Sequence, residues 1–287
     1  MLSNKNILIT GGEGFIGSKL AKALSEENNV KIFDIKSGND IMNFDFILKA
    51  TRDIDVVFHL ASLISVEESI RNPSKYIENI FDGGNNVLRA AAENNVKRFV
   101  FSSSASVYGE GLSSESSPIA PKSTYALLKA VFEKQMKLYD KLETVSLRFF
   151  NVYGPGQKIN SGYSAVIPTF ITNAIKNKDL IIFGNGEQSR DFVYVEDVVR
   201  ACCLAANKGS GVFNVGSGKT TSVNELADII IELSGSKSKR IYKDPKSGEI
   251  FASVSDISKS KSVLGFEPQY NIRDGLSRTI EWFKKNY

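Results

Sequence analysis

Cysteine and histidine are scarce in this sequence, since its 287 residues include two cysteines and one histidine. The cysteines, Cys202 and Cys203, are adjacent within an apolar run that predicts a buried helix, so no structural disulfide can join cysteines of this chain. The histidine, His59, ends an apolar strand pattern, and we interpret it as a buried residue of the fold rather than an acid–base group. We expect no metal site.

Long apolar runs and a strong charge of one sign are absent as well. No segment approaches the roughly 20 apolar residues of a membrane span, and the N-terminus enters a strand pattern directly instead of a signal peptide. The net charge of +4 is small for this length, and the lysines are scattered rather than clustered with aromatic residues. We therefore expect a cytoplasmic protein with neither a membrane nor a nucleic-acid partner.

What the sequence does contain is a glycine-rich turn near its N-terminus. An apolar strand pattern over residues 6–10 leads into Gly11, Gly14 and Gly17, and a helix pattern follows over about residues 18–25. Glycines at this spacing permit a tight turn, close approach of the backbone to a pyrophosphate, and close packing of helix on strand. Phosphate groups are then expected at the helix N-terminus.

A second strand pattern, over residues 30–33, ends at Asp34. A carboxylate at this place accepts hydrogen bonds from the ribose hydroxyls of a dinucleotide and repels the 2′-phosphate of NADP. The order of strand, turn, helix, strand and acid therefore predicts an NAD site. Lys36, two residues further on, leaves NADP as the alternative.

A serine run, Ser102 to Ser104, and the pair Tyr125 and Lys129 suggest redox chemistry on an alcohol. A helix over residues 124–140 places Tyr125 and Lys129 one turn apart on the same face. Because tyrosine normally titrates near 10, it needs a nearby ammonium and partial desolvation to act as a base at neutral pH. A hydroxyl from Ser104 can hold the alcohol. The spacing alone also arises by chance on solvated helices, so the nucleotide site upstream is what favours catalysis.

Apolar strands alternate with helix patterns through the first half of the chain, which predicts an α/β fold with a doubly wound parallel sheet of the Rossmann type. Asp40 follows Asp34 closely, which leaves little room for a third strand and its crossover helix, so this sheet edge is expected to be reduced. The further strands are expected over 56–60, 98–101 and 144–149, with helices over about 76–93, from 124, near 165–176 and over 198–206.

The pattern changes after residue 150, where a smaller α/β region begins. With 42% hydrophobic residues, the chain can bury one large core or two closely joined ones. We expect an NAD-binding domain over residues 1–150, together with segments near 188–205. The remaining segments of 151–287 form the substrate domain.

These motifs, taken in order, resemble those of the extended short-chain dehydrogenase/reductase family, and within it the nucleotide-sugar epimerases and dehydratases, a group that includes the UDP-galactose 4-epimerases. The resemblance runs nearly from end to end. It is carried by residues 10–17 (TGGEGFIG), 59–62 (HLAS), 102–109 (SSSASVYG), Tyr125 with Lys129, 148–155 (RFFNVYGP), 189–198 (SRDFVYVEDV) and 213–218 (FNVGSG).

The resemblance implies NAD as the cofactor, with Asp40 and Ile41 bordering its adenine and Lys129 also bonding its nicotinamide ribose. Leu60 to Ser62 line the pyrophosphate and ribose. The complete implied NAD site is Gly11, Gly14, Phe15, Ile16, Gly17, Asp34, Asp40, Ile41, Leu60, Ala61, Ser62, Ser102, Tyr125 and Lys129.

It also implies that the substrate domain binds a nucleotide sugar. Arg190 offers a planar, charged fork suited to diphosphate oxygens, and Asn151 can present an amide to the same group; a surface ion pair of Arg190 with Asp191 is the alternative. Further substrate residues implied, besides Ser104 and Tyr125, are Val166 and Phe183 at the base, Lys246 in place of a second phosphate-binding arginine, and Ser253, which is small enough to admit an N-acetyl group.

The absence of an acidic pair after Ser104 suggests which reaction to expect. The dehydratases of the family place an Asp–Glu pair after the catalytic Thr or Ser, whereas this chain has Ala105 and Ser106. Elimination then lacks its proton donor, and the related decarboxylases, which keep a Glu there, are also disfavoured. The resemblance therefore implies 4-epimerisation of a UDP-hexose by transient oxidation at carbon 4, with Ser104, Tyr125 and Lys129 as catalytic residues. An NAD(P)H-dependent 4-keto nucleotide-sugar reductase and a non-catalytic NAD-binding protein are the alternatives.

Two further expectations concern helix faces. Many relatives carry an Asn four residues after a Tyr, whereas Tyr76 is followed at that distance by Ile80, with Asn79 one place early. The faces over residues 76–87 and 132–138 are those through which relatives form a homodimer. Packing against the chain's own sheet is the competing use of these apolar residues.

Overall fold

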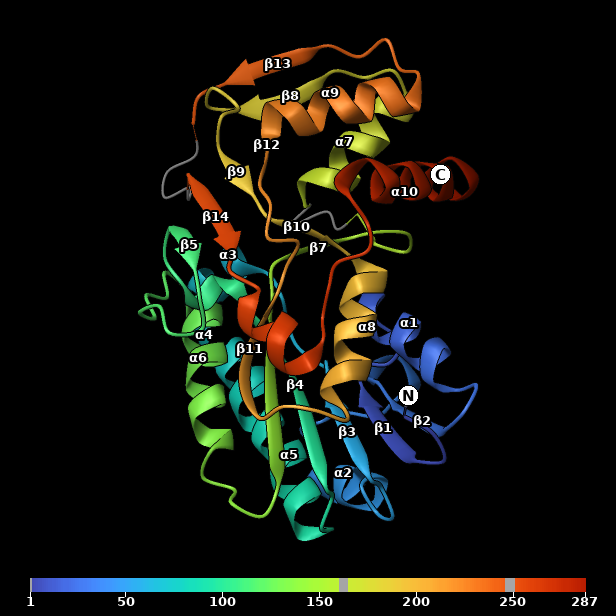
Figure 1. Cartoon of the computed structure of the whole chain (residues 1–287), viewed down its shortest axis with the longest axis vertical. Coiled ribbons are helices and arrows are strands. Elements are labelled where there is room, and N and C mark those ends of the chain that lie inside the picture. Colours follow the sequence, from blue (N-terminus) through green and yellow to red (C-terminus); the bar gives the residue numbers. More distant parts are fainter. Residues whose placement is uncertain (1, 160–164, 246–250) are drawn as a thin grey trace.

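A six-stranded, all-parallel sheet forms the centre of the molecule, in the order β11-β6-β4-β3-β1-β2 (Figure 1). The computed structural model describes residues 2–159, 165–245 and 251–287. The strands of this sheet are β1 (Asn6–Thr10), β2 (Asn29–Phe33), β3 (Val56–His59), β4 (Arg98–Ser104), β6 (Glu143–Phe149) and β11 (Gly211–Val215). The predicted doubly wound sheet is confirmed, and β2 is one of its two edge strands, as the short segment between Asp34 and Asp40 predicted.

Helices cover both faces of the sheet because successive residues of a strand point to opposite sides. Ile7 and Ile9 of β1 pack with helices α1 (Phe15–Leu24) and α8 (Val195–Ala205), which also buries Cys202. Leu8 packs in the opposite layer. That layer contains α2 (Phe44–Ala50), α5 (Gly84–Glu93) and α6 (Thr124–Met136).

The helix predicted over residues 76–93 is present, but it is irregular. It begins as α4 (Pro73–Tyr76), continues as a π-helical stretch over Ile77–Gly83, and then becomes α5. Two consecutive glycines allow close packing here, since a Cβ on Gly84 would lie 2.9 Å from the Phe132 ring. Helix ends also differ from the predictions: α1 begins three residues early because Gly14 already caps it, and α6 ends at Met136.

A second, smaller core lies above the sheet in Figure 1. It is built from α7 (Val166–Ile175), α9 (Val223–Ser234), α10 (Ile272–Asn286), β8 (Leu180–Phe183) and β13 (Arg240–Lys243). Beneath it, β7 (Asn151–Tyr153) pairs with β10 (Phe192–Tyr194).

A small mixed sheet joins the two parts of the molecule in the order β12-β9-β14-β5. Its strands are β5 (Gly111–Ser113), β9 (Ser189–Arg190), β12 (Thr221–Ser222) and β14 (Ala252–Ser255). In the predicted domain division, β11 fell in the substrate domain, whereas here it forms an edge of the six-stranded sheet. Its place there depends on pairing with β6, which lies more than 60 residues earlier and which a local pattern does not reveal.

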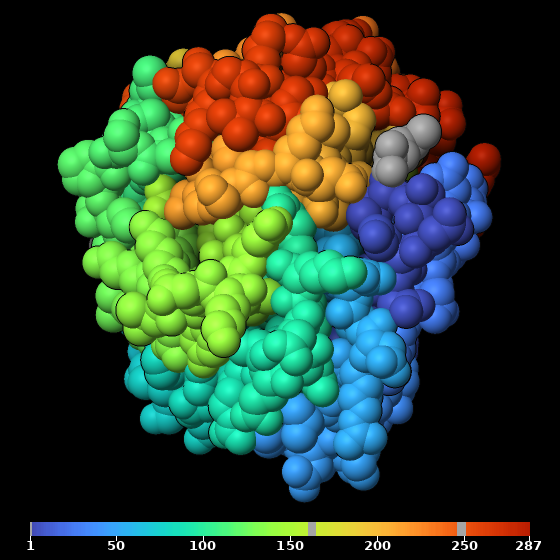
Figure 2. Space-filling model, turned by 60° about the horizontal axis from the view of Figure 1, so that its bottom comes forward, coloured from blue at the N-terminus to red at the C-terminus, as the bar shows by residue number. Residues whose placement is uncertain are grey.

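Figure 2 views the lower end of the molecule, where segments from distant parts of the chain form one continuous face. Arg98 at the start of β4 holds these segments together, although it is almost fully buried. Its Nε donates to the Ala205 carbonyl at 2.6 Å, and its Nη1 donates to Glu143 at 2.6 Å. The sheet is thereby fastened at the end opposite to its carboxyl edge.

The helix predicted from residue 124, which is α6, is held against the sheet by a buried ion pair. On α6, Glu133 accepts from Arg148 of β6 through two bonds, Nε to Oε1 at 2.9 Å and Nη2 to Oε2 at 2.6 Å. Ser103 of β4 donates to the same carboxylate at 2.5 Å. Both charged side chains are 3% exposed. One carboxylate thus joins α6, β4 and β6.

No helix in the described part of the chain is long and apolar enough to cross a membrane. Within residues 2–159, 165–245 and 251–287, no group of three His, Cys, Asp or Glu side chains is arranged to hold a metal ion.

Removing the Glu133 carboxylate should strongly destabilise the fold, because it leaves Arg148 buried without its counter-charge. We expect Glu133→Gln to lower the free energy of unfolding by about 3–5 kcal/mol, measured by urea denaturation. The matched control is Glu93→Gln, since the Arg89–Glu93 pair is exposed by 51% and 46%; we expect a loss of about 0.5 kcal/mol or less there. Equal losses in the two variants would contradict this role.

His59 gives the folded protein a specific dependence on pH. It is 1% exposed, and its Nδ1 lies 2.7 Å from Thr10 Oγ1. Burial, and secondarily the Lys129 charge, lower the pKa of His59 to about 3. In the unfolded chain the group titrates near 6.5, so its stabilising contribution is complete above that pH and is lost as the pH falls toward 3.

We therefore expect His59 to account for a loss of about 2 kcal/mol in unfolding free energy between pH 7 and pH 5. His59→Asn removes the titrating ring, so the loss over this interval should be smaller in the variant by that amount. Denaturant unfolding at the two pH values measures the difference. Parallel curves for wild type and variant would show that the imidazole is not held neutral.

Candidate functional site

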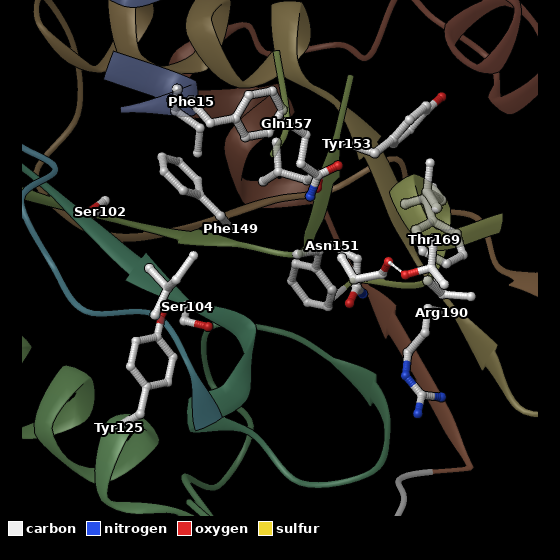
Figure 3. Close-up of a pocket in the computed structure, with 18 of the residues that line it drawn as sticks. Phe15, Ser102, Ser104, Tyr125, Phe149, Asn151, Tyr153, Gln157, Thr169 and Arg190 are labelled. Carbon is white, nitrogen blue, oxygen red and sulfur yellow. Dashed lines mark hydrogen bonds between the residues drawn. The ribbon is translucent and has the colours of Figure 1, made fainter. Parts of the chain in front are cut away.

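A cavity of about 660 Å³ opens at the carboxyl edge of the six-stranded sheet, between it and the smaller core (Figure 3). This is where the chain reverses direction across the sheet, from β1 outward to β2 and back to β3, and where parallel α/β sheets form their ligand crevices. One wall comes from the turn after β1, the end of β4 and α6. The other comes from β7, α7, β8 and β9.

The glycine-rich turn forms one end of the cavity, and its tightness requires glycine. Gly11 has φ +71°, and a Cβ on it would lie 2.7 Å from the Ala61 nitrogen. A Cβ on Gly17 would lie 2.2 Å from the Gly11 carbonyl oxygen. Helix α1 has no side-chain cap at its N-terminus, so its first N–H groups are suited to phosphate oxygens. The predicted Gly11, Gly14, Phe15, Ile16 and Gly17 all line the cavity.

Asp34 lies beside this turn at the end of β2. Its carboxylate is almost fully buried and accepts from the Glu13 nitrogen at 2.9 Å and the Lys36 nitrogen at 3.0 Å. The Lys36 ammonium donates to the Glu13 carbonyl at 2.5 Å. A turn that accepts phosphates, with an acid one strand away, fits the pyrophosphate and ribose of a dinucleotide.

The other predicted cofactor residues divide into two groups. Leu60, Ser62, Ser102 and Lys129 line the cavity, whereas Asp34, Asp40, Ile41 and Ala61 do not belong to its lining. Next to Leu60 and Ser62, the π-helical stretch brings Asn79 to the loop after β3. There its Oδ1 accepts from the Leu63 nitrogen at 2.8 Å, so Asn79 supports the wall through the loop backbone.

Ser104, Tyr125 and Lys129 all line this cavity. Ser104 ends β4, and Figure 3 shows Tyr125 extending from α6 toward it. The start of α6 is fixed at two points: Ser123 accepts from the Ala126 nitrogen at 3.1 Å, and Ser69 accepts from the Tyr125 nitrogen at 3.1 Å.

Lys129 is 2% exposed and lies within reach of the tyrosine. Its Nζ donates to the Ser102 carbonyl at 2.8 Å and lies 5.6 Å from the centre of the Tyr125 ring. Burial lowers the pKa of Lys129 to about 7, against the opposing effect of the Glu133 carboxylate. An anion nearby, such as a phenolate, favours the charged lysine. The arrangement can therefore support proton transfer between Tyr125 and an alcohol held at Ser104.

The opposite wall carries most of the predicted substrate residues. Asn151, Val166, Phe183 and Arg190 all line the cavity, and Figure 3 shows Asn151 and Arg190 on the side away from Tyr125. Arg190 Nη1 donates to the Ser189 carbonyl at 2.9 Å. Asp191 is completely buried, which excludes an exposed Arg190–Asp191 ion pair.

Two predicted substrate residues are not placed in the cavity. Lys246 lies outside the described residues. Ser253 is on β14, paired with Arg190 across the small sheet, and does not belong to the cavity lining. Its position next to Arg190 places it near this wall.

Sequence reasoning missed several lining residues, among them Phe149, Phe150, Gln157, Thr169 and Gln188. Some signals were available. Phe149 and Phe150 follow the same strand pattern that ends at the carboxyl edge, where α/β ligand sites form. Thr169 lies three residues after the predicted Val166 and shares its helix face. Gln157, in contrast, belongs to an irregular loop without a periodic pattern.

Comparison with known proteins identifies the family of this chain. Residues 7–216 match the model of the NAD dependent epimerase/dehydratase family. A Methanocaldococcus jannaschii protein, whose name assigns it provisionally as a UDP-glucose 4-epimerase, is 40% identical over 98% of this chain and 99% of its own. The UDP-N-acetylglucosamine 4-epimerase from Methanobrevibacter ruminantium M1, in complex with UDP-N-acetylmuramic acid, has a TM-score of 0.95 and 37% identity, with both chains covered completely.

A third relative was solved with the cofactor. The UDP-glucose 4-epimerase of Thermus thermophilus, in complex with NAD, has a TM-score of 0.91 and 29% identity over 98% of this chain and 100% of its own. The turn at Gly11 and the acid at Asp34 fit this cofactor. The chain therefore belongs to the NAD-dependent epimerase/dehydratase family, and it is an epimerase whose cofactor is NAD.

Proposed function

We propose that this protein interconverts UDP-hexoses that differ in configuration at carbon 4. The observation that supports this most directly is the convergence of Ser104, Tyr125 and Lys129 in one cavity, opposite Arg190 and Asn151. The first three residues suit reaction at a sugar hydroxyl, and the last two suit binding of a diphosphate. The relatives named above act on UDP-linked hexoses or N-acetylhexosamines according to their names.

In the proposed reaction, Tyr125 removes the proton from the 4-hydroxyl while Ser104 holds the same oxygen by a hydrogen bond. NAD, held at the Gly11 turn and by Asp34, would supply a reversible hydride acceptor for carbon 4, so that no cofactor would be consumed. The Lys129 ammonium stabilises the Tyr125 phenolate, and Tyr125 afterwards returns the proton to the oxygen. Arg190 and Asn151 hold the diphosphate. A sugar tethered mainly by its diphosphate can turn over in the cavity and present its other face.

The residues beside Ser104 argue against elimination and decarboxylation at this site. Ala105 and Ser106 stand where those reactions need a carboxylic acid, and Ser106 instead donates to Ser104 through its nitrogen at 3.2 Å and its hydroxyl at 2.9 Å. These bonds hold the Ser104 side chain at the end of β4. Their donors are neutral and supply no acid of the strength that expulsion of water requires.

The substrate experiment incubates the protein with UDP-Glc, UDP-Gal, UDP-GlcNAc and UDP-GalNAc, without added reductant, and separates the products by chromatography. Interconversion of either pair supports the proposal. Turnover of the acetylated pair would agree with a small residue, Ser253, beside Arg190. If no sugar is converted when NAD is supplied, but a 4-keto sugar is reduced by NADH, the result would favour the reductase over the proposed epimerase.

Replacing the tyrosine should separate catalysis from cofactor binding. We expect Tyr125→Phe to lower kcat by about 10²–10⁴-fold, because the ring remains but the proton acceptor is gone. NAD affinity, measured by calorimetry, should stay within about twofold. Tyr139→Phe is the matched control, because Tyr139 lies beyond the C-terminal end of α6 and outside the cavity lining. Full activity in Tyr125→Phe would remove Tyr125 from the chemistry.

We also propose that two copies of the chain pair through α6 and the π-helical stretch. Of the apolar residues in and next to these helices, Tyr76, Ile80 and Phe132 are buried within the chain itself. Leu127 and Val131, one turn apart on α6, are 50% and 38% exposed, and Ile77 is 43% exposed. The same helix pair on a second copy can cover this face by two-fold symmetry.

Light scattering tests the dimer. Wild type should have about twice the chain mass of 31.6 kDa, and Leu127→Lys with Val131→Lys should have the mass of one chain. Ile241→Lys, at a position that is 42% exposed on β13, is the control that should leave the mass unchanged. A wild type with the mass of one chain would contradict the pairing.

A further inference from the structure

A buried carboxylate directly follows Arg190. Asp191 is completely buried, and its two oxygens accept five hydrogen bonds from neutral groups. Oδ1 accepts from the nitrogen and the hydroxyl of Ser217, each at 2.7 Å. Oδ2 accepts from the Gly218 nitrogen at 3.0 Å, and from the nitrogen and hydroxyl of Ser255 at 3.1 and 2.5 Å. Donors of this kind satisfy the hydrogen-bonding capacity of a carboxylate that is buried away from water.

These donors belong to two different parts of the fold. Ser217 and Gly218 lie in the loop that leaves β11, an edge strand of the six-stranded sheet. Ser255 ends β14 in the small sheet that joins the two cores. The Asp191 side chain therefore connects the sheet that carries the NAD site to the strands that carry the opposite wall.

The backbone of Asp191 holds both residues of the proposed diphosphate site. Its carbonyl accepts from the nitrogen and the side-chain amide of Asn151, each at 3.0 Å. Its nitrogen donates to the Ser253 carbonyl at 2.9 Å, and Ser253 is paired in register with Arg190. A shift of Asp191 must therefore move Asn151 and Arg190 together.

We propose that Asp191 is a positioning residue for the nucleotide-sugar diphosphate, an inference that rests on the proposed function. It touches neither the substrate nor the reacting atoms. Its carboxylate fixes the distance between the cofactor-binding sheet and the Asn151–Arg190 pair, and so sets where the diphosphate binds relative to Tyr125.

The space around the Asp191 carboxylate is tightly packed. A Cβ on Gly216 would lie 2.6 Å from Asp191 Oδ2 and 2.3 Å from the Ser255 hydroxyl oxygen. An amide in place of the carboxylate, as in Asp191→Asn, turns an NH₂ group toward N–H donors on one side. The carboxamide must rotate or move away, and Asn151 and Arg190 move with it.

The test measures binding of UDP and of NAD separately, by calorimetry, in wild type, Asp191→Asn and Ser255→Ala. We expect Asp191→Asn to weaken UDP binding by roughly tenfold or more, the value of one charge-assisted contact. We expect NAD affinity to stay within about twofold. In steady-state kinetics the KM for the UDP-sugar should rise more than kcat falls. Ser255→Ala removes one of the five donors and should show the same pattern, reduced to a few-fold.

Asp197→Asn is the matched control. Asp197 is also a buried carboxylate, and it accepts from the nitrogens of Gln269 and Tyr270 at 2.8 and 3.2 Å, but it holds no cavity residue. If Asp197→Asn weakens UDP binding as much as Asp191→Asn does, or if Asp191→Asn weakens UDP and NAD equally, Asp191 is merely structural and the inference is overturned. If Asp191→Asn does not fold, the loss of UDP affinity is compared with the loss of NAD affinity in Ser255→Ala instead.

The outcomes also separate this inference from the proposed function. A wild type that binds UDP, with an Asp191→Asn variant that binds it equally well, overturns the positioning role alone. A wild type that binds NAD but no UDP overturns the proposed function, and the inference with it.

Discussion

The buried ion pair between Glu133 and Arg148 is the interaction on which the position of α6, and so of Tyr125 and Lys129 in the cavity, depends. A charge moved from water into a protein interior is stable only when its counter-charge and hydrogen bonds are supplied there. Glu133 receives both, from two nitrogens of Arg148 and from the Ser103 hydroxyl. Because these partners come from two adjacent strands, the pair fixes the rotation and height of α6 against the sheet. Lys129 and Tyr125 lie one and two turns before Glu133 on the same helix, so their positions follow from it.

Three buried ionisable groups near the cavity have different surroundings, and the surroundings of each group suit its role. His59 receives no counter-charge, and burial keeps it neutral, as a packing residue of β3 bonded to Thr10. Asp191 is surrounded by N–H and hydroxyl donors, which fix its position without adding a cation beside the site. Lys129 differs from both His59 and Asp191. Burial lowers its pKa to about 7, so its charge responds to an anion placed beside it.

The parts of the fold that the sequence predicted are those encoded by neighbouring residues. The strand from Asn6, the glycines of the turn and Asp34 lie within 30 residues, and each conformation follows from local sterics and hydrogen bonding. The π-helical stretch was not predictable in this way. A Cβ on Gly83 would lie 2.8 Å from Ile41 and one on Gly84 would lie 2.9 Å from Phe132, so the close packing here involves residues distant in sequence.

Only some of the residues that line the cavity were predicted from the sequence. Residues with distinctive chemistry, such as Arg190 and Asn151, were identified because a charged fork or an amide suggests its ligand. The aromatic side chains of Phe149 and Phe150 contribute shape instead, and the only sequence signal for them was their place at the end of a predicted strand. Asp191 entered the sequence analysis only in the alternative for Arg190, a surface ion pair, because the donors that enclose its carboxylate come from residues 217–218 and 255, far away in the sequence.

The connection through Asp191 also bears on how one site can act on both faces of a sugar. In the proposed reaction the hexose must be free to turn over, whereas its diphosphate and the reacting tyrosine must stay at a fixed separation. A rigid link between the two walls meets both needs, because it keeps the diphosphate site at a fixed distance from Tyr125 while the hexose between them is tethered mainly by its diphosphate. The sugar can therefore be free to turn only if the walls are rigid. If the diphosphate were held loosely, carbon 4 would lose its alignment with Tyr125 each time the ring turned.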